Sequence, residues 1–258
     1  MTFNEFNLKD LLQKAIDEAG FKEPSPIQEQ AIPFVLAGRD IVGQAHTGTG
    51  KTAAFGLPIL NNMKGNSGVE AVVIVPTREL AMQVSDELYR FGKFLGINTA
   101  TVYGGQAYAR QIKLIENAGI IVATPGRFLD LLRGDKIDIK PDYVILDEAD
   151  EMLDMGFLDD IKEIFTFLPK ERQTLLFSAT MPLAIKNLAK TILNEPEFIT
   201  LTKSDVTNSK ITQTFYVVDE RERDDALIRL YDYKNPTKSI IFCRTKKEVD
   251  RLSTFMVS

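Results

Sequence analysis

The sequence contains very few of the residues that cross-link a chain or bind transition metals. Among its 258 residues are one cysteine, Cys243, and one histidine, His46. A single cysteine cannot form a disulfide within the chain, and a single imidazole cannot build a histidine-rich metal site. The N-terminal residues also lack the basic start and apolar stretch of a signal peptide. We therefore expect the protein to work in the reducing cytoplasm.

Long hydrophobic runs and an excess of positive charge are also missing. The longest apolar runs, such as residues 72–75, have the length of a strand and not the ~20 residues that cross a bilayer, so we expect no membrane role. The 36 acidic residues outnumber the 31 basic ones, and the net charge is −5. Non-specific binding to nucleic acid normally depends on clustered lysines and arginines. A nucleic-acid site here would therefore be a local groove of backbone amides and a few arginines.

The pattern of apolar residues predicts an α/β fold. Hydrophobic residues make up 44% of the chain and charged residues 26%, which is typical of a globular protein with a core. Short apolar runs, typical of buried strands, alternate with amphipathic helical stretches. This alternation indicates a parallel sheet with helices on both faces. The expected strands are residues 41–42, 72–75, 120–123, 144–146 and 175–177.

Two helices are expected near the N-terminus. Asn7 is a suitable N-cap for the first, and Gly20 is a natural stop. Ser25 is a suitable N-cap for the second, with Pro26 in its first turn.

A polar segment at residues 203–210 predicts a domain boundary. We expect a first domain at residues 1–205, a linker at 206–210 and the truncated start of a second domain at 211–258. The expected elements of that second part are strands at 211–218 and 239–242, a helix at 223–231 and another helix from residue 245.

Residues 45–52 fit a phosphate-binding loop in which alanine replaces the first glycine. The loop follows an expected strand and opens a helix, as the motif requires. Its glycines let backbone N–H groups surround phosphates, Lys51 can reach the β and γ oxygens, and the Thr52 hydroxyl can bind Mg²⁺. A plain glycine-rich turn is the alternative. The motif predicts binding of ATP or GTP by Ala45, His46, Thr47, Gly48, Thr49, Gly50, Lys51 and Thr52.

An acidic cluster, residues 147–150, directly follows an expected strand. A phosphate-loop ATPase needs an acid at this edge of the sheet to hold Mg²⁺ and a second group to orient water. Asp147 suits the metal and Glu148 suits the water, so we expect Lys51, Asp147 and Glu148 to be the catalytic residues. The alternative is a plain helix start, where carboxylates are favoured by the helix dipole.

The ordered set of motifs resembles the DEAD-box family of RNA helicases. Residues 147–150 spell the motif that names the family, and Phe21, Pro24, Pro26, Ile27 and Gln28 resemble its Q motif, within residues 3–29. Further similar motifs are residues 76–80, 104–105, 124–127 and 178–180, in the family's order. The resemblance implies two RecA-like phosphate-loop domains that face each other across ATP and RNA. It also implies an ATP-dependent RNA helicase or a remodeller of RNA–protein assemblies, with ATP and Mg²⁺ as cofactors.

The resemblance also implies roles for single residues. Gln28 would read the adenine edge, because an amide donates and accepts at once, and Phe21 would stack on the adenine face. Without the family, we would expect Phe21 in the core and Gln28 in solvent. The coupling of ATP state to RNA binding would belong to Asp150, Ser178 and Thr180, with Asp150 as the hydrogen-bond partner. Hydroxyls after a strand are otherwise ordinary helix caps.

RNA contacts follow from the same resemblance. The implied set is Pro76, Thr77, Arg78, Gly105, Thr124, Gly126 and Arg127. Hydroxyls, arginines and glycine amides bind phosphates without reading bases, so RNA binding would be independent of sequence. Arg78 and Arg127 could instead be solvated residues at helix starts.

Three expectations concern the function of the chain as a whole. Family members carry a later basic motif that nothing in these residues matches, so we expect the chain alone to bind ATP without unwinding RNA. One alternative is an RNA-binding scaffold switched by ATP. Another is a DNA-directed helicase of related architecture, although Gln28 with Phe21 and Pro26 favours the DEAD-box family.

Overall fold

The computed structural model describes residues 1–65, 68–201, 212 and 214–257. The chain divides into unit 1, Met1–Thr207, and unit 2, Asn208–Ser258. The expected linker at residues 206–210 lies outside the described residues. Each unit is described below by itself.

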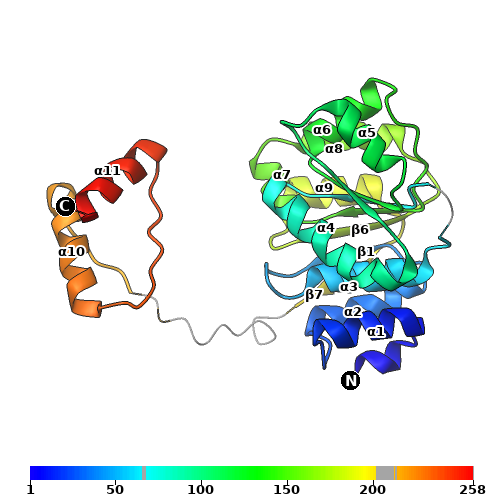
Figure 1. Ribbon diagram of the computed structural model, residues 1–258, viewed down its shortest axis with the longest axis horizontal. Helices are drawn as coiled ribbons and strands as arrows, with labels where there is room; N and C mark the ends of the chain where they lie inside the picture. The colour runs from blue at the N-terminus through cyan, green and yellow to red at the C-terminus, as the bar shows by residue number, and fades with distance from the viewer. Residues whose placement is uncertain (66–67, 202–211, 213, 258) are drawn as a thin grey trace. The chain divides into compact units, whose positions relative to one another are not determined.

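Unit 1 alternates strands and helices along the chain (Figure 1). Its strands are β1 (Ile41–Gln44), β2 (Ala71–Ile74), β3 (Thr99–Val102), β4 (Ile120–Ala123), β5 (Tyr143–Leu146), β6 (Gln173–Ser178) and β7 (Glu197–Thr200). Its α-helices are α1 (Asp10–Ala19), α2 (Pro26–Leu36), α3 (Lys51–Asn62), α4 (Arg78–Gly92), α5 (Tyr108–Ile115), α6 (Pro125–Arg133), α7 (Ala149–Asp154), α8 (Leu158–Phe167) and α9 (Leu183–Ile192). Two short 3-10 helices are η1 (Phe3–Phe6) and η2 (Lys93–Leu95).

The described strands of unit 1 form one seven-stranded sheet in the order β3-β4-β2-β5-β6-β1-β7. Every pair of neighbours is parallel. The expected parallel α/β sheet is therefore confirmed. In such a sheet all the strands end at one edge, so the loops that follow them meet there.

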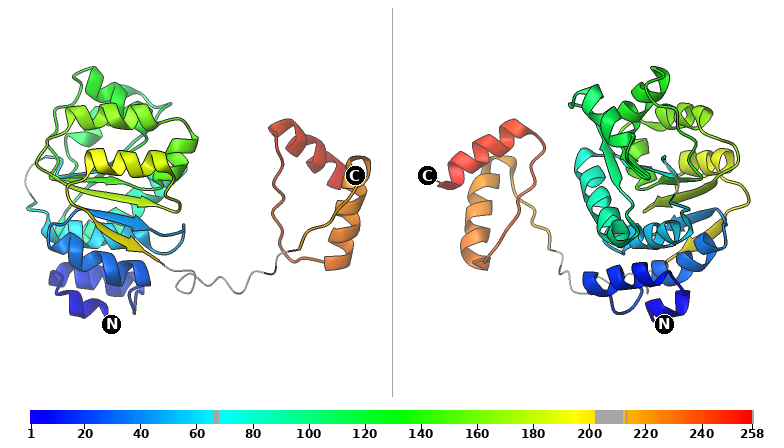
Figure 2. Two further views of the ribbon diagram at one scale, coloured as in Figure 1. Left: turned by 180° about the vertical axis from the view of Figure 1, so that it is seen from behind. Right: turned by 45° about the vertical axis from the view of Figure 1, so that its right-hand side comes forward.

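Two hydrophobic cores cover the two faces of the sheet. Helices α1 to α4 pack on one face over alternate strand residues such as Val73 and Ile145. Helices α5 to α9 contribute to the other face, where the alternating partners such as Val72 and Val144 point. Figure 2 shows both layers of helices from further directions. Strands buried on both faces explain the continuous apolar runs in the sequence.

Strands β3 and β7 were not expected from the sequence. Both lie at the edges of the sheet, and both have exposed or half-buried positions within four residues. A half-exposed edge strand does not need an apolar run, so the pattern that identified the interior strands fails there.

The first helix begins later than expected. Asn7 is not its N-cap: Asn7 has φ 52 and ends η1, and α1 begins at Asp10. Asparagine tolerates this left-handed conformation better than most residues. The stop at Gly20 is confirmed, since Gly20 has φ 79 directly after α1. The second helix, α2, begins at Pro26 with Ser25 in the N-cap position, as expected.

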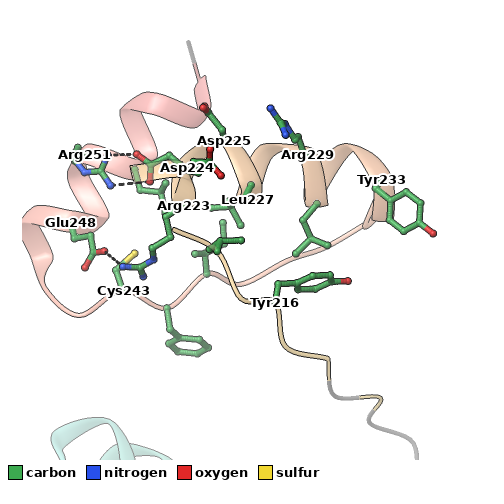
Figure 3. A pocket seen from close by; sticks show the side chains of 17 residues that line it. Tyr216, Arg223, Asp224, Asp225, Leu227, Arg229, Tyr233, Cys243, Glu248 and Arg251 are labelled. Carbon is green, nitrogen blue, oxygen red and sulfur yellow. Dashed lines mark hydrogen bonds and ion pairs between the residues drawn. The ribbon is translucent and has the colours of Figure 1, made fainter. Parts of the chain in front are cut away.

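Unit 2 contains a 3-10 helix, η3 (Glu220–Glu222), and two α-helices, α10 (Arg223–Lys234) and α11 (Lys246–Val257). Two ion pairs join the helices, one between Arg251 and Asp224 and one between Arg223 and Glu248 (Figure 3). Beside them lies a cavity of about 590 Å³. Both helices were expected from the sequence.

The two strands expected in unit 2 are not present among its described residues. Residues 214–219 and 239–243 have no strand partner, and Ile211 and Gln213 lie outside the description. Their apolar side chains stay exposed, as with Val217 at 91% and Phe242 at 89%. A strand exists only through hydrogen bonds to a neighbouring strand, so apolar alternation alone cannot make one. No described helix in either unit has the length and apolar character needed to span a bilayer.

Candidate nucleotide and RNA sites

Except for Phe21 and Gln28, which precede β1, the expected site residues lie at the carboxyl edge of the sheet, in two groups. The phosphate-loop residues, the acidic cluster and residues 178–180 follow or end β1, β5 and β6, which are neighbours. The implied RNA residues follow β2, β3 and β4, which are also neighbours. The order of the strands therefore brings together motifs that are far apart in the sequence, and it separates the nucleotide group from the RNA group.

Residues 45–50 form a tight loop between β1 and α3. Ala45 is buried, and its N–H donates to O of Ser178 at 3.0 Å. Gly48 and Gly50 have φ 81 and φ 88, a conformation that glycine adopts without strain. A side chain at Gly50 would meet Nε2 of Gln28 at 2.4 Å. The positive φ therefore favours glycine at residue 50, and a side chain there would also displace the amide of Gln28.

Lys51 is buried and faces the acidic cluster. Its Nζ lies 2.8 Å from Oε1 of Glu148 and 3.6 Å from Oδ1 of Asp147. Nζ also donates to O of Ala45 at 3.3 Å. The same Oε1 of Glu148 accepts a hydrogen bond from Oγ1 of Thr47 at 3.0 Å. The structure thus joins the three expected catalytic residues and one loop hydroxyl in a single network.

Asp147 is almost completely buried at the end of β5. Burial raises the pKa of its carboxyl to about 6, the cation of Lys51 opposes this shift, and the charge of Glu148 adds to it. Oδ1 of Asp147 accepts the N–H of Glu148 at 3.0 Å. An acid with such a pKa exchanges its proton close to neutral pH, so its charge is sensitive to any cation placed beside it.

Glu148 has a left-handed backbone, with φ 56 and ψ 52. For a residue other than glycine this conformation costs about 1–2 kcal/mol. The left-handed conformation turns the chain from β5 into α7, and the carboxylate of Glu148 lies beside Lys51. Backbone strain of this kind is commonly found at functional sites.

Gln28 is buried at 4% exposure and not solvent-facing, so the alternative from the sequence is wrong. Its Oε1 accepts the N–H of Ser25 at 2.9 Å, and its Nε2 donates to O of Gly50 at 3.0 Å. The hydroxyl of Ser25 donates to O of Thr49 at 2.7 Å. The bonds from Gln28 to Gly50 and from Ser25 to Thr49 therefore connect the start of α2 to the phosphate loop. The adenine-reading role of Gln28 stays a prediction.

Phe21 is half-buried beside a small aromatic cluster. Its ring centroid lies 6.1 Å from that of Phe3 and 5.9 Å from that of Phe91. Phe21 also lines a cavity of about 370 Å³ together with Phe3 and Lys22. The ring thus contributes to the core and borders a cavity, and its stacking on adenine stays a prediction.

The side chains at this site that could hold Mg²⁺ would do so through oxygen atoms. No group of three His, Cys, Asp or Glu side chains that could hold a metal occurs in the parts of the chain that the structure describes. Asp147 and Thr52 supply a carboxylate and a hydroxyl, which suit Mg²⁺ when water and nucleotide phosphates provide the other ligands. The Thr52 hydroxyl is hydrogen-bonded to the half-buried carboxylate of Glu87, whose pKa is raised chiefly by burial.

Asp150 contacts residues 178–180 as expected. Its N–H donates to Oγ of Ser178 at 3.1 Å, and its Oδ2 accepts from Oγ1 and N of Thr180, both at 2.8 Å. Burial alone would raise the pKa of Asp150, but the hydrogen bonds from Thr180 and Ser178 outweigh burial and lower it. The predicted hydrogen-bond partnership is confirmed, and the coupling role stays a prediction.

The implied RNA residues after β2 and β3 lie against each other. Arg78 is exposed at the start of α4, and a side chain at Gly105 would meet its Nη1 at 3.1 Å. Gly105 has φ 94. Thr77 is the N-cap of α4 and accepts the N–H of Leu80 at 3.2 Å, whereas Pro76 is buried. Arg78 is therefore a helix-start residue that also covers a glycine loop.

Arg127 is a half-buried residue with fixed contacts and not a freely solvated one. Its Nη1 donates to O of Gln106 at 2.7 Å and to Oε1 of Gln111 at 3.2 Å. Gln111 is completely buried, and its Nε2 donates to O of Tyr103 at 2.8 Å. Thr124 and Gly126, half-buried, belong to the same turn after β4.

The sequence patterns did not identify three residues that the structure places at these sites. Glu87 contacts Thr52, and Gln111 and Tyr108 contact Arg127. All three lie in amphipathic helices, where a polar residue normally indicates a solvated face. Only the packing of one helix on its neighbours shows that these side chains point inward.

Known proteins agree with this arrangement. The sequence model of the DEAD/DEAH box helicase family matches residues 25–188, which include the phosphate loop, the acidic cluster and the whole of the implied RNA group. The chain belongs to the DEAD/DEAH box helicase family. Its unit 1 is a RecA-like domain of this family.

Three relatives illustrate the match. The DEAD-box ATP-dependent RNA helicase RhpA of Helicobacter pylori is 56% identical over 100% of this chain and 53% of its own length. The DEAD-box ATP-dependent RNA helicase CshA of Bacillus subtilis is 48% identical over 98% of this chain and 52% of its own. A crystal structure of a DEAD box protein from Methanococcus jannaschii aligns with a TM-score of 0.76 and 42% identity, covering 100% of this chain and 70% of that one. The chain spans about half the length of the curated relatives it matches.

Proposed function

We propose that the protein is an ATP-dependent RNA helicase, or a remodeller of RNA–protein assemblies, that couples ATP hydrolysis to sequence-independent binding of RNA. The observation that carries the proposal is the division of one sheet edge into two groups of residues. One is the nucleotide group, and the other is the RNA group, whose side chains and amides can donate hydrogen bonds to RNA phosphates. Asp150 joins β5 to the end of β6 within the nucleotide group, through its bonds to Ser178 and Thr180. The other neighbour of β5 is β2, which is followed by α4 with Arg78 at its start.

The network around Lys51 supports a role in ATP hydrolysis. Bound MgATP would supply the phosphoanhydride that is cleaved and a metal that neutralises phosphate charge. Lys51 can pair either with Glu148 or with a phosphate oxygen. When Lys51 turns to a phosphate, Glu148 keeps its bond from Thr47 and can accept a proton from water. We assign Asp147 and Thr52 to the metal, and Gln28 and Phe21 to the adenine.

A binding experiment tests the proposal directly. Residues 1–258 should bind MgATP in calorimetry, and Lys51→Met should abolish that binding because the ammonium is lost. Single-stranded RNA should bind in fluorescence anisotropy with equal affinity for unrelated sequences and with a strong salt dependence. An ATP affinity that Lys51→Met leaves unchanged would contradict the nucleotide assignment.

We further propose that residues 1–258 alone bind ATP but do not unwind RNA. The described residues of unit 2 form two α-helices and one 3-10 helix but no strand. The relatives that are named helicases are about twice as long. Duplex unwinding and RNA-stimulated ATP hydrolysis by residues 1–258 would both argue against this proposal.

The cellular setting follows from the proposed substrates. We propose that the protein acts in the cytoplasm, where ATP and RNA are both present. A DNA-directed helicase is the rival class, and competition between RNA and DNA strands of the same sequence separates the two. An ATP-switched scaffold would bind both ligands without turning over ATP.

A further inference from the structure

One aromatic residue beside the implied RNA group holds two cations. The Cζ atom of Arg127 lies 4.2 Å from the ring centroid of Tyr108, and the Nζ atom of Lys136 lies 3.7 Å from the same centroid. The Tyr108 hydroxyl donates to Oδ2 of Asp130 at 3.2 Å. Tyr108 begins α5, whereas Arg127 and Asp130 lie on α6, so the ring joins two helices and gathers two charges.

The turn after α6 is built to bring Lys136 back to this ring. Asp135 has φ 48, and the N–H of Lys136 donates to O of Leu131 at 3.1 Å. Although Lys136 itself is exposed, its ammonium lies over an aromatic face.

The two cations are not neutralised by ion pairs. Within the described ranges, neither Arg127 nor Lys136 forms an ion pair, whereas Arg133, at the end of the same helix, pairs with Glu163. Asp130 is bound to the Tyr108 hydroxyl and can offset one charge. Like charges held on one ring repel each other, and a bound anion removes that cost.

The free donors of Arg127 suit a phosphate. Both of its hydrogen bonds within the described part of the chain are made by Nη1. A guanidinium carries five N–H donors, so Nη2 and Nε remain for a ligand. The carbonyl of Gln106 that holds Nη1 is next to Gly105, the glycine against which Arg78 lies. The cations of Arg78 and Arg127 therefore flank one short loop.

We propose that Tyr108 is a positioning residue that holds Arg127 and Lys136 as a pair of cations for neighbouring phosphates of the RNA backbone. The inference rests on the RNA binding proposed above and adds Tyr108 and Lys136 to the residues that serve it. The ring orients Arg127 by a cation–π contact, and Oε1 of Gln111 accepts a hydrogen bond from the same guanidinium. The site reads charge and not bases.

The test measures binding of a fluorescent single-stranded RNA by residues 1–258 across a range of salt concentrations. Tyr108→Leu should weaken binding about three- to tenfold, as expected for the loss of one or two oriented cations. It should also reduce the slope of log K against log salt by about 0.7 for each lost phosphate contact. Lys136→Met should reduce the slope by about 0.7. Tyr108→Phe keeps the ring and should retain affinity and slope.

Matched controls separate positioning from charge and from folding. Lys14 lies 4.3 Å from the ring centroid of Phe94, away from the RNA group, so Lys14→Met and Phe94→Leu repeat the same changes elsewhere. Both should leave the RNA slope unchanged. MgATP affinity should stay within about twofold in every variant, since a single cation–π contact is weak and none of these residues touches the nucleotide group.

The possible results are distinct. If Arg127→Met weakens RNA binding while Tyr108→Leu retains the wild-type affinity and slope, the positioning role is overturned and the RNA proposal stands. A parallel loss of MgATP affinity in Tyr108→Leu would show a structural effect and would also overturn it. If the unchanged chain does not bind RNA, or binds it as well after Arg127→Met, the proposed RNA site fails and this inference fails with it.

Discussion

The Nζ atom of Lys51 lies 2.8 Å from Oε1 of Glu148, with both side chains buried. Lys51, which is expected to bind phosphate, thus forms an ion pair with Glu148, which is expected to orient water. Each must release the other before either can serve ATP hydrolysis. Two of the predictions below follow from this pair.

Replacing Lys51 should destabilise the protein as well as abolish ATP binding. Lys51→Met would leave Asp147 and Glu148 buried without their cation, and breaking a buried pair costs about 3–5 kcal/mol. Proton uptake by Asp147 will relieve part of this cost. Thermal and urea unfolding measure the change. Lys162→Met, which removes an exposed partner of Asp159, should have little effect on the free energy of unfolding.

Replacing Glu148 by glutamine should separate binding from hydrolysis. The amide oxygen can still accept from Lys51 and Thr47, so we expect MgATP affinity within a few-fold of the wild type. It cannot take a proton from water, so hydrolysis by the full-length enzyme should fall by about 10²–10⁴. Single-turnover kinetics and equilibrium binding on the same preparation measure both quantities. Normal turnover in Glu148→Gln would make the assignment of Glu148 wrong.

Two glycines of the phosphate loop should respond differently to alanine. Gly48 and Gly50 both have positive φ, so either substitution costs about 1–2 kcal/mol in backbone strain. Nothing lies within 4 Å of a side chain at Gly48, but a side chain at Gly50 would meet Nε2 of Gln28 at 2.4 Å. Gly50→Ala should therefore lower the melting temperature and the ATP affinity more than Gly48→Ala. Equal effects would show that the contact with Gln28 is not rigid.

Gln28 should affect both nucleotide choice and the order of the loop. Gln28→Ala should weaken ATP more than GTP, because an amide matches the donor and acceptor of adenine. It should also speed hydrogen exchange near Gly50, because the bond from Nε2 to O of Gly50 is lost. Gln28→Glu is the matched control for the hydrogen bond to O of Gly50, because an ionised carboxylate has the shape of the amide but cannot donate that bond. An equal loss of ATP and GTP would count against base reading.

The binding of MgATP should depend on pH near 6. Burial raises the pKa of Asp147 from 3.8 to about 6. Between these two pH values Asp147 is protonated in the folded chain and ionised in the unfolded chain. Asp147 therefore lowers the free energy of unfolding as the pH rises from about 4 to 6. Magnesium needs the carboxylate, so the Mg²⁺-dependent part of ATP affinity should fall about tenfold per pH unit below 6.

Calorimetry between pH 5 and about 8, with Mg²⁺ or with a chelator, measures this dependence. Asp147→Asn should remove it, because an amide does not titrate. A wild-type profile that is flat over this range would show that Asp147 stays ionised when the metal binds.

The sequence alone specified the interior of the sheet and the chemistry of its edge. Strands β2, β4, β5 and β6 are buried on both faces, so burial demanded apolar runs that are visible in the sequence. The phosphate loop is similarly visible, because its backbone conformation requires glycine at residues 48 and 50. Burial of a strand and a left-handed backbone each restrict the residue type at the position itself, so both can be recognised in the sequence.

Only the tertiary structure decided which side chains meet. Edge strands β3 and β7 escaped prediction because half of their residues need not be apolar, and the expected strands at 211–218 and 239–242 failed because a strand needs a partner. The burial of Gln28, the pairing of Lys51 with Glu148 and the stacking of Arg127 on Tyr108 join residues that are distant in the chain. Contacts between distant residues depend on how helices and strands pack, and a polar residue in a helix looks the same in sequence whether it faces water or a partner.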